Sequence, residues 1–393
     1  MTDEASTTQQ ETKKQKRSFI AELKDAGFGA KHMKVFYIIL LSALCIYLMS
    51  RLFPDFGEFW SRYPGMYIRR FMSFITGWFD FSLFEIIIVC LPILLAYAIV
   101  RIIIIDGKKT TLKGAYRTVK VLVCIATVLL SLFMTAFGTC YFRYPLEKNL
   151  GLTDSKVSAE QIYNTAVYVA LQTQELCKGT TFAPGGESLM PYSYDELVTK
   201  LNADYARYCA DVDYIDGYAV NPKPIALSEP FTYTHISGVY SFVTGESNIN
   251  VNYPDFITPF TMAHEMAHQH GIAPEDEANF VAYLVCIQSD DDYIRYSAYT
   301  SMLNYLRTAL YNADKELYND FIAEYYTSEM RGEQNSYSVM FKKYQSSTAS
   351  TVTDKINNAY LTSQGQKEGT ASYGLVVDLA IAYYEANEQS EQK

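Results

Sequence analysis

Three of the five histidines in this 393-residue chain fall within seven residues, at positions 264, 268 and 270. His264 and His268 are four residues apart, so on a helix they lie one turn apart on the same face, where two imidazoles can share one zinc ion. Glu265 would lie beside that face, where its carboxylate can accept a proton from water. This HExxH pattern predicts a Zn²⁺ cofactor and the hydrolysis of a peptide or protein substrate.

A catalytic zinc site needs a third protein ligand, and the residues that follow offer one. Gly271 can end the first helix and Pro274 can open a second one. On that second helix Glu275 and Asn279 are one turn apart, so Glu275 can reach the metal while Asn279 supports a ligand from behind. We favour Glu275 as the third ligand, with Glu277 as the alternative.

Two strands are predicted just before the zinc helix, over residues 238–252. The first of them would bind the substrate backbone as an added strand, and an ordinary structural hairpin is the alternative. Its residues are Gly238, Val239, Tyr240, Ser241 and Phe242.

The group that stabilises the transition state is harder to choose, because the chain has 34 tyrosines. Tyr373 is the candidate donor, and His235 and Tyr240 are alternatives. His270 is offset by two residues from His268, so we expect it to face away from the zinc, at the surface or behind the ligands.

The elements that must position these residues are mainly helical. Helices are predicted over 159–177, where Ser158 and Gln161 form a capping box, and over 194–208, 258–270 and 274–288. The last hundred residues also have helical patterns. Residues 143–385 are therefore expected to form an α+β, mostly helical domain, followed by a disordered polar tail at 386–393.

Three apolar runs precede this domain, at 35–50, 81–105 and 121–142. Each can supply about 20 residues, enough to cross a bilayer, and only Glu85 and Arg101 interrupt them. We expect three transmembrane helices within residues 33–142; three buried helices of a large soluble domain are the alternative. Between the first two runs, aromatic residues at helical spacing predict two short amphipathic helices at the membrane interface, over 54–80, with a packed or re-entrant loop as the alternative.

Charge is distributed unevenly along the chain. Residues 1–142 carry 17 Lys and Arg against 10 Asp and Glu, and residues 143–393 carry 16 against 33. The basic residues gather in the leader 1–32 and in the second loop, which favours a cytoplasmic N-terminus. Three crossings of the cell membrane then place the C-terminal domain outside. The acidic half has no basic stripe, which argues against a nucleic-acid partner.

Cysteine usage and composition leave two properties open. The domain has an odd number of cysteines, of which Cys177 and Cys209 could form a disulfide outside the cell or remain thiols. The sequence gives no indication of the oligomeric state.

The spacing of these motifs resembles known peptidase families. HExxH followed by a helix that opens Glu-x-x-Ala-Asn resembles the gluzincins, which include membrane-bound prenyl-protein proteases and repressor-cleaving metallopeptidases. Three spans followed by Thr244-Gly245-Glu246, the stretch 264–271 and the stretch 275–284 are similar to a bacterial family of unknown function described as membrane zinc peptidases. This resemblance covers nearly the whole chain and implies a zincin-like domain.

One spacing departs from these families. Only six residues separate His268 from Glu275, whereas most gluzincins have their third ligand much further along the chain. Gly271 stands where metzincins have their turn glycine, but Pro274 stands where they have a third histidine.

The sequence thus predicts a membrane-anchored zinc metallopeptidase. A non-catalytic, zinc-containing module that binds peptides or assembles a complex in the membrane is the alternative. Glu265 speaks against it, because a structural zinc site has no need of an acid there. A metal-dependent hydrolase of cell-wall or lipid substrates is a further alternative.

Overall fold

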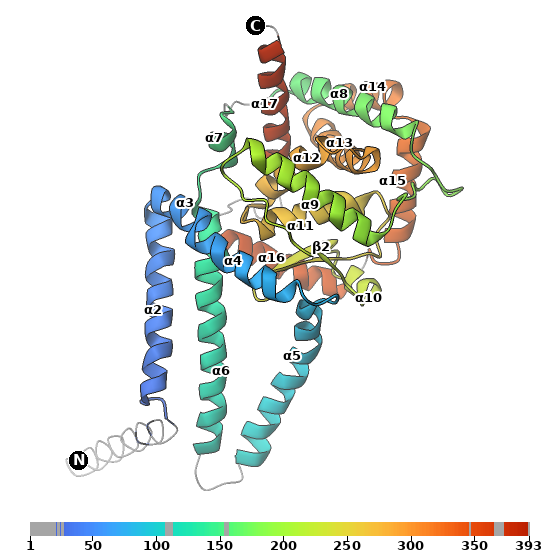
Figure 1. The fold of residues 1–393 in the computed structure, drawn as a ribbon. Helices are drawn as coiled ribbons and strands as arrows, with labels where there is room; N and C mark the ends of the chain where they lie inside the picture. The colour runs from blue at the N-terminus through green and yellow to red at the C-terminus, as the bar shows by residue number, and fades with distance from the viewer. Residues whose placement is uncertain are drawn as a thin grey trace, which may run out of the picture. The chain divides into compact units, whose positions relative to one another are not determined.

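The computed structural model describes residues 21, 24, 27–106, 113–152, 157–345, 347–364 and 373–391. It is mostly helical, as predicted, with a small sheet (Figure 1). The chain divides into two compact units: one comprises Met1–Met49 and Ile86–Thr135, the other Ser50–Glu85 and Ala136–Lys393.

The first unit contains most of three long apolar helices. The helical segments are α2 (Lys31–Leu52), α5 (Leu83–Val100) with the π-helix η1 (Arg101–Asp106), and α6 (Lys113–Leu132) with the π-helix η2 (Phe133–Phe137) and the 3₁₀-helix η3 (Gly138–Phe142). Three stretches are long and apolar enough to cross a membrane: Lys31–Leu52, Leu83–Ile104 and Ala115–Phe142. The predicted spans are therefore present as helices. The predicted leader 1–32 lies largely outside the described residues.

The second unit is built around α11 and α12, in which nearly every residue is buried. Apolar side chains of α8, α9, α13 and α17 complete one continuous core around them. The helices of this unit are α3 (Pro54–Arg62), α4 (Pro64–Thr76), α7 (Leu146–Leu150), α8 (Ala159–Cys177), α9 (Tyr194–Asp211), α10 (Ser228–Thr232), α11 (Ile257–Gln269), α12 (Glu275–Ile287), α13 (Asp292–Ala313), α14 (Lys315–Glu324), α15 (Ser328–Phe341), α16 (Thr348–Ser363) and α17 (Tyr373–Glu391).

Local sequence signals fix where several of these helices begin. Ser158 and Gln161 form the predicted capping box, and α8 has the predicted bounds. Ser193 and Glu196 form a second capping box at the start of α9, and in both boxes the side chains satisfy backbone N–H groups of the first turn. At the other end of the chain, α17 continues through residues 386–391, so the prediction of a disordered tail is wrong for these residues.

A three-stranded sheet lies against α11. Its strands are β1 (Lys223–Pro224), β2 (Gly238–Ser241) and β3 (Glu246–Ile249), in the order β1-β3-β2. The predicted hairpin is the antiparallel pair β2–β3, in which Val239 faces Asn248. Strand β1, which pairs with β3 in parallel, is not among the predicted elements. Because β3 is central, β2 is an edge strand.

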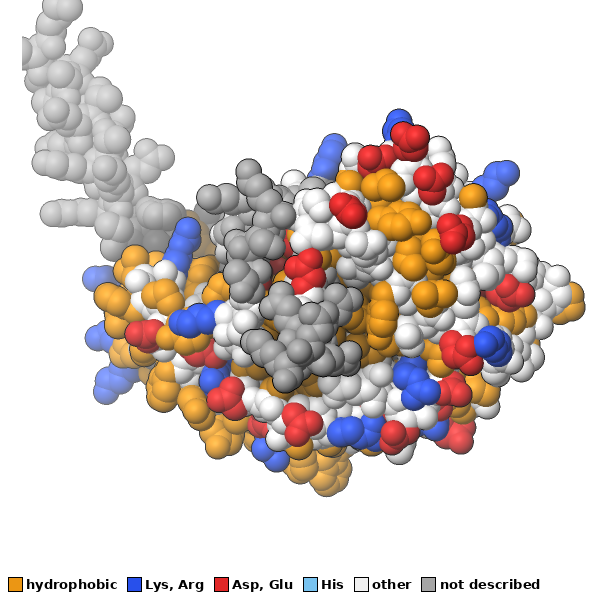
Figure 2. Space-filling view, turned by 90° about the horizontal axis from the view of Figure 1, so that it is seen from above, with side chains coloured by type: hydrophobic (Ala, Val, Ile, Leu, Met, Phe, Trp, Pro, Cys, Tyr) orange, Lys and Arg blue, Asp and Glu red, His pale blue; other side chains and the backbone are white. Residues whose placement is uncertain are grey.

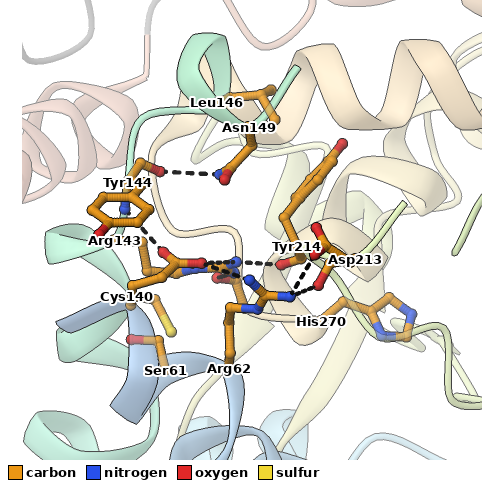
Figure 3. A network of polar contacts seen from close by, with 12 residues as sticks. Ser61, Arg62, Cys140, Arg143, Tyr144, Leu146, Asn149, Asp213, Tyr214 and His270 are labelled. Atoms are coloured by element: carbon orange, nitrogen blue, oxygen red, sulfur yellow. Dashed lines mark hydrogen bonds and ion pairs between the residues drawn. The ribbon is translucent and has the colours of Figure 1, made fainter. Parts of the chain in front are cut away.

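The segment 50–85 and residues 136–142 pack with the C-terminal domain, so the compact unit is larger than the predicted domain 143–385. Arg143 donates to the Glu58 carboxylate of α3, to Gly271 O at 3.0 Å and to Tyr214 O. Arg62 of α3 donates to Asp213 O, and Figure 3 shows both arginines reaching the loop that carries Asp213 and Tyr214. Residues that the sequence assigns to the membrane region thus form one wall of the domain.

Adjacent side chains of β3 form hydrogen bonds to two different helices, α5 and α11. Glu246 accepts hydrogen bonds from the backbone N–H groups of Leu83 and Phe84, in the first turn of α5, at 3.3 and 3.1 Å. Ser247 points the other way, as strand geometry requires, and donates to Glu265 O of α11 at 2.8 Å. Strand β3 therefore bonds both the start of α5, in the second candidate span, and α11, the helix of the HExxH motif. The stretch Thr244-Gly245-Glu246, which carries the family resemblance, leads into this strand.

The surface carries mixed charge. In the space-filling view of Figure 2, acidic side chains are interspersed with basic and hydrophobic ones. Cys177 and Cys209, which could have formed a disulfide, are both free thiols.

Candidate metal centre

The buried helix α11 carries His264, Glu265 and His268. It ends at a left-handed residue, Gly271, with φ of +96°. The N–H of Gly271 bonds His268 O at 2.9 Å and the N–H of Ile272 bonds Ala267 O at 3.0 Å. This Schellman ending requires a residue that tolerates positive φ and turns the chain back so that α12 can begin at Glu275.

The turn brings Glu275 onto the two histidines. Its Oε2 atom lies 3.3 Å from His264 Nε2 and 3.5 Å from His268 Nε2. One potential ligand atom from each of the three residues lies within 4.8 Å of the other two. The structure thus brings together His264, His268 and Glu275, as the favoured interpretation of the sequence expects.

The His268 ring is held in a defined orientation. Its Nδ1 lies 2.7 Å from Ile272 O, so Nδ1 carries a proton and Nε2 is the ring atom that faces Glu275. Phe137 packs edge-on against the ring, with 6.0 Å between centroids. Burial acts to lower the pKa of His268, but the charges of Glu275 and Glu265 outweigh it and raise the pKa to about 9. Such a site is electrostatically poised for a cation.

Glu265 lies beside the cluster and is held by β2. The backbone N–H of Tyr240 donates to its carboxylate, and burial raises its pKa from the ordinary value, although His264 and His268 partly offset this. Gly238 lies so close that a Cβ there would come within 2.7 Å of Glu265 Cγ. The predicted edge strand therefore contacts the predicted base directly.

Glu277 and Asn279 take other positions. Glu277 Oε1 accepts the backbone N–H of Leu146 at 3.2 Å, and burial raises its pKa to about 8. Glu277 is outside the three-residue cluster. Asn279 lies one turn after Glu275 and accepts a hydrogen bond from Tyr305 Oη at 3.2 Å.

The cluster opens into a cavity of about 850 Å³ lined by β2, α11, α13, α15 and α16. His235, one alternative donor, lines this cavity, but its Nε2 lies 2.8 Å from Tyr344 O. Tyr240, the other alternative, packs its ring against Phe137. Tyr373 begins α17, and its side chain is outside the described residues.

Four tyrosines that were not predicted from the sequence line the cavity: Tyr141, Tyr305, Tyr337 and Tyr360. Tyr141, at the end of the third candidate span, and Tyr360, in α16, place their hydroxyl oxygens 3.2 Å apart. No local signal distinguishes them from the other tyrosines. His270 faces away from the cluster as expected, but it is buried between Tyr205 and Tyr218 rather than at the surface.

The donor set fits a zinc ion. Ligand atoms about 2.1 Å from one ion at tetrahedral angles lie about 3.4 Å apart. The two separations from Glu275 Oε2, 3.3 and 3.5 Å, are close to this value, and the ligand atoms of all three residues lie within 4.8 Å of one another. Two imidazoles and one carboxylate leave a fourth position for water or substrate. His268 has the usual second partner of a metal-binding histidine, whereas His264 Nδ1 is buried without one among the described residues.

Comparison with known proteins gives one finding. The model of a family described as "Protein of unknown function (DUF3810)" matches residues 61–381, a range that includes α4, the sheet, α11 and α12. Neither the curated proteins nor the solved structures contain a match to this chain.

Proposed function

This chain belongs to the DUF3810 family of proteins of unknown function, and we propose from the geometry of its site that it is a membrane-anchored, zinc-dependent metallopeptidase. One observation carries the proposal: His264, His268 and Glu275 converge at the wall of a large cavity, with the carboxylate of Glu265 beside them. A purely structural site would have no need of an open cavity or of an adjacent acid.

Each residue has a role in this proposal. His264, His268 and Glu275 hold the zinc ion, which when bound supplies Lewis-acid polarisation of a peptide carbonyl and activation of water. Glu265 accepts the proton of the attacking water as general base, and its raised pKa suits that role. Tyr141 and Tyr360 donate hydrogen bonds to the oxygen that becomes negatively charged. Their position in the cavity wall supports this assignment.

The substrate backbone binds along β2. This strand is at the edge of the sheet and lines the cavity at Gly238, Val239 and Tyr240. An edge strand can bind an extended peptide through its outward backbone groups, although in β2 the N–H of Tyr240 already bonds the Glu265 carboxylate. The contact between Gly238 and Glu265 supports the proposal, because a peptide added there would pass the base.

We also propose that the three candidate spans cross the cell membrane, with the N-terminus in the cytoplasm and the domain outside. The lengths and apolar composition of the helices support the crossings. The lysines and arginines of the leader and of the second loop support the orientation.

The decisive experiment compares wild type with Glu265→Gln, both as the full chain in phospholipid vesicles. Glutamine keeps the shape of the side chain but cannot accept the proton. We expect the variant to retain zinc and to lose hydrolysis of a randomised peptide library by at least about 100-fold, the range of general-base contributions.

Glu277→Gln is the matched control, because it removes a buried carboxylate of the same site region outside the cluster. It should retain both zinc and activity. Hydrolysis that persists in Glu265→Gln would refute the role of the base. Zinc and peptide binding without hydrolysis in the wild type would favour the non-catalytic module instead.

A further inference from the structure

Helices α3 and α4 have the reverse of ordinary amphipathicity. Several of their exposed side chains are large and aromatic: Phe71 is 63% exposed and Phe74 is 64%, and Trp78, two residues after the end of α4, is 77% exposed. Apart from Met66, their buried side chains are polar, including Ser61, Arg69 and Ser73. A helix at the surface of a water-soluble domain turns its apolar stripe inward. This pair turns it outward, toward a surrounding that must itself be apolar.

The polar inner face is tied to the end of α11. Arg69, 1% exposed, donates to Ala136 O at 2.7 Å and to Ser61 O at 3.0 Å. Gln269, one residue after His268, donates through Nε2 to Ser73 Oγ at 2.9 Å and to Gly245 O at 2.7 Å. Helix α4 therefore contacts the end of α11 with its buried polar face and exposes its aromatic face on the opposite side.

The connections of the chain identify what covers the aromatic face. A single residue separates α3 from α2, and six residues separate α4 from α5. Because α2 and α5 lie in candidate spans, and six extended residues reach at most about 20 Å, α3 and α4 cannot lie far from the membrane surface. Tryptophan and tyrosine are the side chains that prefer the headgroup region. A lipid surface against the aromatic face agrees with the exposure of these side chains, with the short connections to the candidate spans and with the preference of tryptophan and tyrosine for headgroups.

We infer that the aromatic face of α3 and α4 rests in the surface of the bilayer, and that the cavity takes polypeptides that are themselves bound to the membrane. The second statement rests on the proposed peptidase function; the first does not. One helix, about 10 Å thick, separates the lipid from the end of α11. The cluster then lies about 10–20 Å above the lipid, a height that an extended chain reaches in about three to six residues.

The lipid contact can be tested on the full chain, which has only two tryptophans, Trp60 and Trp78. When the Trp60→Phe variant is placed in vesicles, all tryptophan fluorescence comes from Trp78. We expect lipids brominated near the headgroup to quench Trp78 at least about twofold more than lipids brominated at the chain terminus. They should also quench it more than half-buried Trp60, measured in Trp78→Phe. Quenching of Trp78 by aqueous acrylamide but by neither brominated lipid would overturn the lipid contact.

The substrate class is tested with long randomised peptides that carry either a palmitoyl chain or an acetyl group at the N-terminus. Wild type in vesicles should cut the tethered peptides at least about 100-fold faster, through effective concentration. The cuts should fall within about the first six residues from the anchor. Cuts spread evenly along the tethered peptides would overturn the substrate class while leaving the peptidase function intact. Absence of any cut, with Trp78 quenched as expected, would overturn the peptidase function and the substrate class together, but not the lipid contact.

Discussion

Gly238 of β2 lies directly against Glu265 of α11. A Cβ added at Gly238 would come within 2.7 Å of both Cγ and Oε1 of Glu265, and within 2.8 Å of Thr261 Cγ2. No side chain larger than hydrogen fits between the edge strand and the Glu265 carboxylate. The position of the carboxylate therefore depends on a glycine that contributes no chemistry itself.

Gly238→Ala should impair hydrolysis without removing zinc. The added methyl group must displace the Glu265 carboxylate, and a shift of about 1 Å at a catalytic group can cost about 100-fold in rate. Zinc content and peptidase activity, measured on the same preparation, give the comparison. Gly374→Ala is the control, because no atom lies within 4 Å of its added Cβ. Equal loss in both variants would mean that the contact has no special role.

Metal content should separate Glu275 from its neighbour Glu277. Glu275→Ala removes the carboxylate that lies between the two imidazoles. Loss of a residue that only supports a metal ligand typically weakens metal binding by about 10–100-fold, and loss of this carboxylate should weaken zinc binding at least as much. His264→Ala and His268→Ala should behave alike. Glu277→Gln should keep full zinc content by elemental analysis. Zinc lost in Glu277→Gln but kept in Glu275→Ala would reverse the assignment.

Tyr141→Phe should slow hydrolysis by about 100-fold, the typical effect of losing one donor to the transition state. Zinc content should not change, because Tyr141 is not part of the three-residue cluster. The exposed Tyr311 provides a matched control in Tyr311→Phe. Full activity in both Tyr141→Phe and Tyr360→Phe would exclude this pair and direct attention to other groups of the cavity wall.

Arg69 and Arg70 are adjacent in sequence but should differ in their effect on stability. Arg69→Met leaves the carbonyl groups of Ser61 and Ala136 without their buried donor, so we expect a loss of at least about 2 kcal/mol. Arg70 is 55% exposed and pairs with Asp216 only at 4.0 Å, so Arg70→Met should change stability by less than about 1 kcal/mol. Thermal unfolding of the two variants in vesicles checks the difference.

Glu333 should make the stability of the domain depend on pH. Burial raises its pKa above the ordinary 4.5, although bonds from Ser188 and Tyr296 partly offset the effect. The folded state therefore holds the proton more tightly than the unfolded chain, and stability falls as pH rises above about 4.5, levelling off above the folded pKa. Unfolding midpoints of wild type and Glu333→Gln, measured from pH 4 upward, should diverge in that direction. Exposed Glu316→Gln should run parallel to wild type.

Local patterns predicted the site helices closely. The expected helices 258–270 and 274–288 differ from α11 and α12 by one residue at each end. Gly271 and Pro274 made this possible, because a left-handed ending and a proline before the next helix are signals contained in a few neighbouring residues. The β2–β3 hairpin was predictable for the same reason.

Contacts between distant segments could not be predicted in this way. Glu275 and Glu277 are two residues apart on one helix and point in different directions. Which of them reaches the histidines depends on the position of α7, where the N–H of Leu146 binds Glu277. Arg69 and Tyr141 belong to the site region only because segments far apart in sequence pack together. Short β1 has too few residues to carry a pattern.

The hydrogen bonds of Arg69 and of β3 also limit how this protein could be processed. A protease that cut between Thr135 and Arg143 would separate residues 143–393 from α3, α4 and the start of α5, which belong to the same compact unit and bond α11 and β3. Under the function proposed above, release of residues 143–393 alone would therefore remove the segments that hold the end of the histidine helix, α11.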